Sequence, residues 1–140
     1  MNKLFWAFQI LVSLAFALFG LQKVFMEIPD LIAQGMLWIE DFPEWQVRTI
    51  GALEFLGVVG LNLPLLWKAL PRLLVPISAG ALALTMVGAI ATHVLRADPI
   101  LSVIITSILF AMCVALAVKR FREVNEAGAT GEVGEVAEAA

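Results

Sequence analysis

Apolar residues dominate four long segments of the chain, and polar residues gather between them. The apolar segments cover residues 4–26, 47–67, 72–96 and 99–120. Each is close to the roughly 20 residues that a helix needs to cross the hydrocarbon core of a bilayer. The pattern therefore predicts an all-α protein, a transmembrane four-helix bundle over residues 1–121.

The first apolar segment has a second interpretation. A secretory signal peptide also starts with a basic residue, here Lys3, and ends at small residues such as Ala15 to Ala17. The apolar run continues past Ala17, which favours a membrane span over a cleaved leader.

Two polar segments lie outside the spans. Residues 28–46 contain two prolines and four acids, and are predicted to form an outer interfacial loop. Apolar residues in this loop, such as Leu31 and Trp38, could form a short helix in the membrane interface. Residues 122–140 are mainly Ala, Gly, Glu and Val without apolar periodicity, and predict a disordered acidic tail.

Basic residues at the ends of the spans predict the orientation. One side carries Arg48 and Arg96, and the other carries the larger set Lys3, Lys68, Arg72, Lys119, Arg120 and Arg122. Because cytoplasmic loops are enriched in Lys and Arg, both termini are expected in the cytoplasm.

Composition agrees with a lipid environment and argues against several classes of function. Of the 140 residues, 61% are hydrophobic and 15% are charged, whereas a soluble domain has about 25% charged residues. No cluster of Lys and Arg on a soluble face suggests a nucleic-acid partner. Cys113 is the only cysteine, so no disulfide forms within the chain. One histidine with scattered acids does not make a metal site.

Three ionisable residues, Lys23, Glu54 and His93, lie within or near the ends of three different spans, in the outer half of the predicted bundle. An ionised group inside a membrane helix is costly, so such groups usually face the bundle interior and pair with one another. We therefore expect Glu54 to meet Lys23 across the first two spans, with His93 joining them from the third. These three residues form the candidate ligand-binding site, and no catalytic residue is assigned.

Each of these residues also has a simpler interpretation. Lys23 could extend to the membrane surface, or pair only with Glu27 four residues further along the same helix. His93 could be a polar anchor at the interface, and Glu54 could have a structural role. The other polar residues within the spans are expected to form hydrogen bonds between helices: Asn62, Thr85, Ser102 and Thr106.

Three short motifs resemble those of the DoxX-like family of small four-helix membrane proteins. They are GLQK at 20–23, IGALEFLGVVGL at 50–61 and MVGAIATH at 86–93. The resemblance covers about residues 4–121 and omits the acidic tail.

Carried over residue by residue, the resemblance places the family's glycine and lysine at Gly20 and Lys23. Its buried acid falls at Glu54, followed by Gly57, and its histidine falls at His93. The resemblance implies a multi-pass bundle in the cytoplasmic (inner) membrane. Founding members of the family are associated with thiosulfate:quinone oxidoreductase, other relatives with membrane complexes that handle oxidative stress, and distant animal relatives with chaperone-like assembly.

Two hypotheses of function follow. In the first, the chain is an accessory or quinone/small-amphiphile-binding subunit of a membrane redox complex, with a soluble oxidoreductase or sulfurtransferase as partner beside the lipid bilayer. No pattern in the sequence binds a flavin, haem or iron–sulfur cluster, so electron chemistry would need a quinone or a partner protein. In the second, the chain is a structural or chaperone-like membrane protein whose buried polar cluster only fixes helix packing. A transporter is disfavoured because the four spans show no inverted repeat.

Overall fold

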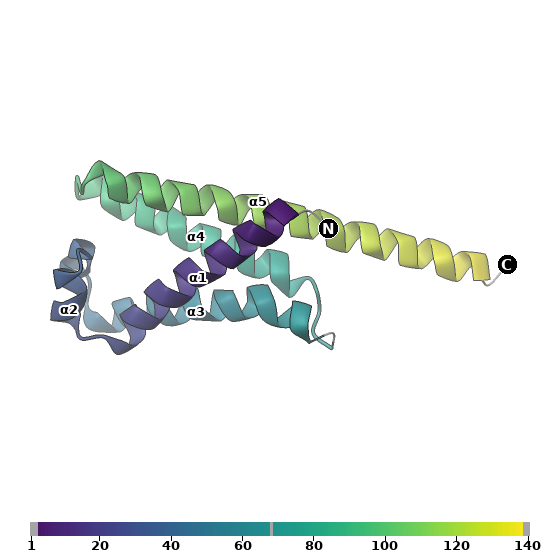
Figure 1. Ribbon diagram of the computed structural model, residues 1–140, viewed down its shortest axis with the longest axis horizontal. Coiled ribbons are helices and arrows are strands. Elements are labelled where there is room, and N and C mark those ends of the chain that lie inside the picture. Colours follow the sequence, from purple (N-terminus) through teal and green to yellow (C-terminus); the bar gives the residue numbers. More distant parts are fainter. Residues whose placement is uncertain (1–2, 68, 139–140) are drawn as a thin grey trace.

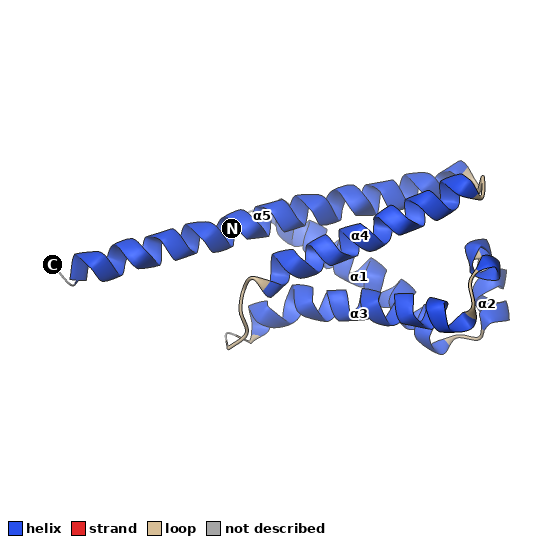
Figure 2. Ribbon diagram, turned by 180° about the vertical axis from the view of Figure 1, so that it is seen from behind, coloured by secondary structure: helices blue, strands red, loops and turns tan. Residues whose placement is uncertain are grey.

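The computed structural model describes residues 3–67 and 69–138, with side chains as far as residue 129. The described chain contains helices and connecting turns and no strand (Figure 2). Its elements are α1 (Lys3–Phe25), α2 (Ile28–Ala33), the 3-10 helix η1 (Leu37–Asp41), α3 (Glu44–Leu66), α4 (Leu74–Leu95) and α5 (Ile100–Glu138). The prediction of an all-α fold is confirmed.

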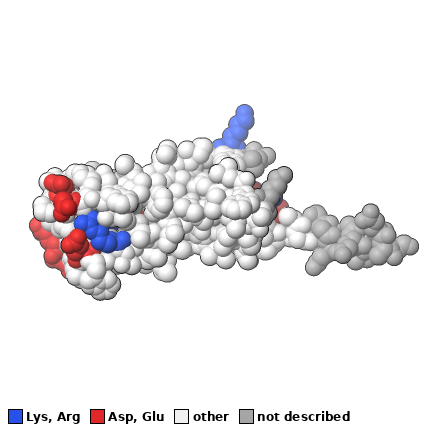
Figure 3. Space-filling view, turned by 90° about the horizontal axis from the view of Figure 1, so that it is seen from below, with Lys and Arg blue, Asp and Glu red and all other residues white. Residues whose placement is uncertain are grey.

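Four helices are long and apolar enough to cross a membrane: α1, α3, α4 and residues Ile100–Ala129 of α5. They match the four predicted spans, and the expected interfacial loop is present as α2 and η1. On the face seen in Figure 3, charged side chains lie toward the two ends of the molecule and the middle is uncharged, as a bilayer requires. The chain is thus a multi-pass integral membrane protein.

The spanning helices are arranged as two pairs. Helix α1 packs on α3, helix α4 packs on α5, and the two pairs also meet through contacts of α3 with α4 (Figure 1). A shared core joins the pairs, formed by side chains such as Phe16, Leu82, Cys113 and Leu116. The pairs separate toward the end at which α2 lies (Figure 1). We call residues 28–42 the cap, this end of the bundle the cap end, and the opposite end the tail end.

Two glycines allow α1 and α3 to approach closely near the cap end. A Cβ atom added to Gly51 would lie 2.7 Å from both the carbonyl oxygen of Gly20 and the Cβ of Lys23. A Cβ atom added to Gly20 would lie 2.9 Å from the carbonyl oxygen of Gly51. Real Cβ atoms do not come this close to a backbone, so glycine is required at both positions. The crossing holds Lys23 directly against α3.

Arg48, in the second turn of α3, fixes the end of α1. Its Nη1 donates hydrogen bonds to the backbone carbonyls of Lys23, Val24 and Met26, at 2.8, 3.2 and 2.5 Å. The last carbonyls of a helix have no partner within the helix, and a guanidinium satisfies them while also favouring the negative end of the helix dipole. Sequence analysis used Arg48 only to predict orientation.

The helix α5 continues into the C-terminal tail, residues 122–140, for which disorder stays a prediction. It extends through Glu138 and projects beyond the bundle (Figure 1), and residues 139–140 lie outside the described residues. Alanine and glutamate are good helix formers, and a helix that is already nucleated needs only one hydrogen bond per added residue to grow.

Candidate functional site

Lys23 and Glu54 form a buried ion pair between α1 and α3. The Nζ of Lys23 donates to both carboxylate oxygens of Glu54, at 2.7 Å to Oε1 and 2.6 Å to Oε2. Lys23 is 8% exposed and Glu54 is 2% exposed. The predicted pair is therefore confirmed, and Lys23 neither extends to the surface nor takes Glu27 as its partner.

The cap covers this ion pair with an aromatic side chain. The ring centroid of Trp38 lies 5.8 Å from the Nζ of Lys23, within the range of a cation–π interaction. Trp38 itself packs edge to face on Phe42, with ring centroids 5.4 Å apart. An apolar cover of this kind lowers the local dielectric and strengthens the attraction between the ammonium and the carboxylate.

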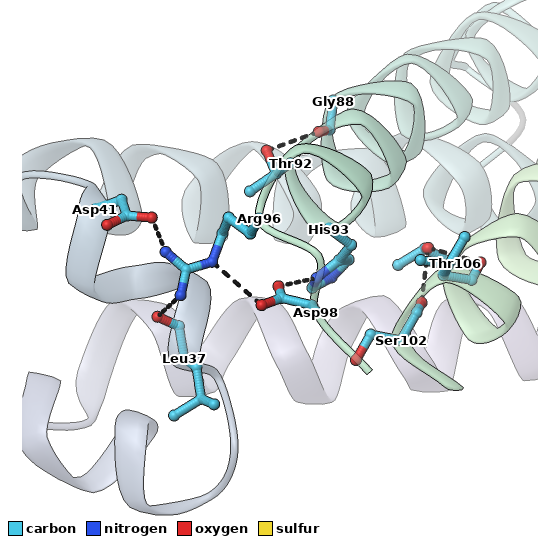
Figure 4. Close-up of polar contacts among 10 residues, drawn as sticks. Leu37, Asp41, Gly88, Thr92, His93, Arg96, Asp98, Ser102 and Thr106 are labelled. Atoms are coloured by element: carbon cyan, nitrogen blue, oxygen red, sulfur yellow. Dashed lines mark hydrogen bonds and ion pairs between the residues drawn. The ribbon is translucent and has the colours of Figure 1, made fainter. Parts of the chain in front are cut away.

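His93 has a different partner from the one expected. Its Nδ1 lies 2.7 Å from the Oδ2 of Asp98, in the turn after α4, instead of joining Lys23 and Glu54 (Figure 4). The backbone explains the pairing: Ala97 adopts a left-handed conformation with φ of 54°, and the N–H of Asp98 bonds the carbonyl of His93 at 3.0 Å. This tight turn folds Asp98 back onto the histidine ring.

Arg96 ties the same turn to the cap. Its Nη2 donates to the carbonyl oxygen of Leu37 at 3.1 Å, its Nε lies 3.3 Å from the Oδ1 of Asp98, and its Nη1 forms an ion pair with Asp41 (Figure 4). The hydrogen bond from His93 holds the pKa of Asp98 below its usual range; the contacts with Arg96 act in the same direction and partial burial opposes them. The carboxylate of Asp98 thus stays ionised, which favours a proton on the Nδ1 of His93.

A cavity of about 540 Å³ lies between the two helix pairs beneath the cap, and Lys23, Glu54 and His93 all line it. This volume is within the range of small-molecule sites in proteins, roughly 300 to 1,000 Å³. Most of the wall is aromatic or aliphatic and comes from all four spans and the cap: Phe16, Phe19, Met36, Trp38, Phe42, Ile50, Leu53, Met86, Ala89, Ile105 and Leu109. The three predicted residues therefore share one cavity, although only two of them are in contact.

Further polar groups in the wall were not predicted as site residues. The Oε1 of Gln22 is buried and has no hydrogen-bond partner among the described residues. Thr85 and Thr106, expected to bond across helices, instead donate to carbonyls of their own helices, at 2.7 Å to Leu82 and 2.8 Å to Ser102. Gln22, Thr85, Ser102 and Thr106 all line the cavity, so the wall offers several polar contacts to a ligand. In the described part of the chain, no three metal-binding side chains lie together.

A second buried polar cluster lies at the tail end. Arg120, which in the sequence served only to predict orientation, is buried, and its Nη2 donates to the Oε1 of Gln9 at 2.5 Å. The amide of Gln9 in turn donates to the carbonyl of Leu61 at 2.9 Å, and Glu123 pairs with Arg120 at 2.9 Å. These contacts connect α1, α3 and α5, and the residues do not line the cavity, so we assign them a structural role.

The ion pair between Lys23 and Glu54 predicts non-additive effects on stability. Lys23→Met or Glu54→Leu alone leaves one buried charge without its partner, which costs about 3–5 kcal/mol of the free energy of unfolding. The double variant removes both charges, and we expect it to lose much less than the sum of the two single losses. Unfolding in one detergent measures the cycle, with Glu44→Leu as the control, because its exposed pair with Arg48 contributes no more than about 1 kcal/mol. Simple addition of the single losses would contradict the pairing.

The lowered pKa of Asp98 predicts how stability depends on pH. Because the folded pKa lies below the unfolded value of about 3.9, the stabilisation is complete above that pH and is lost as pH falls through the folded pKa. The wild-type chain should therefore have a higher Tm than Asp98→Asn at neutral pH, and the difference should shrink at pH values below about 4. Thermal unfolding of both chains across this range tests the prediction. A Tm difference that stays constant across the titration would argue against it.

Comparison with known protein families identifies the family to which the chain belongs. The model of the DoxX-like family matches residues 7–116, a stretch that contains Lys23, Glu54, His93 and Asp98. No curated protein and no solved structure matches the chain. Because the family match extends over most of the 140 residues and reaches all four spanning helices, the chain belongs to the DoxX-like family.

Proposed function

We propose that the protein is an accessory subunit of a membrane redox complex and binds a quinone or another small amphiphile in the cavity at the cap end. The observation that carries this proposal is the combination of a large apolar wall with a few convergent polar groups, the usual composition of a small-molecule site. Lys23, Glu54 and His93 are the proposed ligand-binding residues.

The electrostatics of the site favour a neutral polar head group. The charges of Lys23 and Glu54 balance each other across 2.6 Å, so neither a free anion nor a free cation gains a net attraction. An ammonium carries three N–H donors, and Glu54 accepts from two of them. One donor of Lys23 is left for a ligand carbonyl, while the unpaired Oε1 of Gln22 can accept from a ligand hydroxyl. A quinone or quinol head carries these groups, and the aromatic and aliphatic wall suits its ring and chain.

Localisation and partners belong to the same proposal. We place the chain in the cytoplasmic membrane with both termini in the cytoplasm and the cap outside, on the distribution of basic residues at the span ends. A soluble oxidoreductase or sulfurtransferase is the proposed protein partner, because electron transfer to or from a bound quinone needs a second redox protein.

A second candidate function is structural or chaperone-like. It is favoured by the ion pair itself, since both oxygens of Glu54 are occupied by Lys23 next to the close crossing of Gly20 and Gly51. A pair in this position fixes the register of α1 on α3 without any ligand.

Filling the cavity separates the two candidates. Gly88 lines the cavity and Gly80 does not, both lie on α4, and neither has an atom within 4 Å of an added Cβ. Gly88→Phe should weaken binding of a short-chain ubiquinone analogue about tenfold or more, because one aromatic side chain takes up ligand space. Gly80→Phe should leave the affinity unchanged, and both should keep the parental Tm.

The binding measurement can use Trp38 as the reporter, because it lines the cavity. Replacing Trp6, Trp45 and Trp67 with Phe leaves Trp38 as the only tryptophan, and the quinone analogue quenches its fluorescence on binding. Absence of quenching in this parent chain, or equal affinity in Gly88→Phe and Gly80→Phe, would reject the ligand proposal in favour of the structural one.

The partner is tested by purification of the full chain from native membranes in mild detergent. We expect a soluble oxidoreductase or sulfurtransferase to be retained at a stoichiometric level and to be released by high salt, since contacts with a membrane subunit at its charged ends are screened by ions. Purification of the chain without any such protein would contradict the accessory-subunit part of the proposal.

A further inference from the structure

The side of the cavity nearest the membrane surface is covered by the cap, in which Gln34 and Gly35 of the cavity wall are themselves exposed. Leu31, Ile39 and Val47 are almost completely buried in a core of their own beneath this surface. Arg96 fastens the cap to the turn between α4 and α5 through Leu37 and Asp41. A ligand dissolved in water would therefore have to displace a packed and hydrogen-bonded segment.

The two sides of the cavity that face the lipid are open by comparison. Phe19 of α1 and Ile105 of α5 both line the cavity and are 39% and 46% exposed. Leu53 of α3 is also part of the wall and is 53% exposed, and Gly88 of α4, another wall residue, is exposed as well. Wall residues with exposed surface thus occur on all four spanning helices, which are surrounded by lipid.

The geometry of the helix pairs explains why openings form at this end. At the tail end, Arg120 bonds Gln9 across α5 and α1. Near the middle of the bundle, Gly57 of α3 contacts Leu82 of α4 without room for a Cβ. Toward the cap end the pair of α1 and α3 separates from the pair of α4 and α5 (Figures 1 and 2). At this end the helix α1 lies apart from α5, and α3 lies apart from α4 (Figures 1 and 2), and the wall of the cavity contains residues of all four helices.

The depth of the cavity places both gaps beside acyl chains. On α4 the wall extends from His93 to Thr85, eight residues apart, or about 12 Å along the helix. One leaflet of the hydrocarbon core is about 15 Å thick. The openings thus span most of the leaflet next to the cap.

We propose that the cavity exchanges its ligand laterally with the membrane, through the gaps between α1 and α5 and between α3 and α4, so that it selects amphiphiles dissolved in the leaflet next to the cap. This inference rests on the proposed binding function and specifies the source of the ligand. The head group reaches Lys23 beneath the cap, and the apolar chain leaves between the helices into lipid. Ligands that approach from water are excluded by the cap.

Cysteine accessibility in the full chain, reconstituted in phospholipid nanodiscs, tests the route without a ligand. The native Cys113 is fully buried and provides the unreactive background. Thr106→Cys and Thr85→Cys place thiols on the cavity wall facing the two gaps. Ile104→Cys, exposed to lipid outside the cavity, and Asp30→Cys, exposed on the cap, are the matched controls.

Each variant is treated with a membrane-soluble pyrene maleimide and, separately, with a charged methanethiosulfonate that stays in water. We expect the pyrene reagent to label both wall thiols within about tenfold of the rate at Ile104→Cys, since an apolar reagent partitions freely into the bilayer. The charged reagent should label them about 100-fold more slowly than Asp30→Cys, because a charge is strongly disfavoured in the hydrocarbon core.

Two results would overturn lateral exchange. Rapid labelling of both wall thiols by the charged reagent would show that water reaches the cavity past the cap. Failure of the pyrene reagent to label either wall thiol, in variants that keep the parental Tm, would show that the sides are closed. Neither result depends on quinone binding, so a failed binding measurement with the predicted labelling pattern rejects the proposed ligand and leaves the route standing.

Discussion

The ion pair between Lys23 and Glu54 is the interaction on which the cap end of the bundle depends. A carboxylate or an ammonium alone in the hydrocarbon core is expensive, and each offsets the cost of the other only if the two are held in contact. The contact needs α1 and α3 to cross closely, and glycine at positions 20 and 51 provides the necessary room. Arg48 then holds the backbone of α1 at the same level. The ion pair, the close approach of the two backbones and the contacts of Arg48 thus all stabilise the same crossing of α1 and α3.

The sequence predicted the features that follow from a large free-energy cost at particular residues. The four spans follow from long apolar runs, and the pairing of Glu54 with Lys23 follows from the cost of burying either one alone. The partner of His93 could not be found in this way, because it depends on the left-handed turn at Ala97. Alanine gives no signal for that conformation, which is most common for glycine and asparagine.

The cavity and its polar wall depend on how the helices are arranged in space, and the pattern of apolar and polar residues did not predict them. The cavity arises where two helix pairs separate, and its polar wall residues were read as links between helices because each lies on an apolar span. One such link is real, since the amide of Asn62 donates to the hydroxyl of Ser13 at 2.8 Å. Thr85 and Thr106 satisfy their hydroxyls within their own helices, which leaves them free to face an open space. In the sequence Arg120 served only to predict orientation, and its burial could not be predicted because a residue at the end of a span can point either way.

The two ends of the bundle use buried polar contacts to opposite effect. At the tail end, Arg120 and Gln9 join α5 to α1, so the two helix pairs are held together across their interface. At the cap end, the strongest polar contact lies within one pair, between α1 and α3, while Arg96 connects the other pair to the cap. At that end the two helix pairs are therefore connected through the cap, which covers the cavity, and not by polar contacts across the cavity. A bundle joined in this way can keep an open interior at one end while its opposite end remains tightly packed. The positions of its few buried charges determine which end is open and which end is packed.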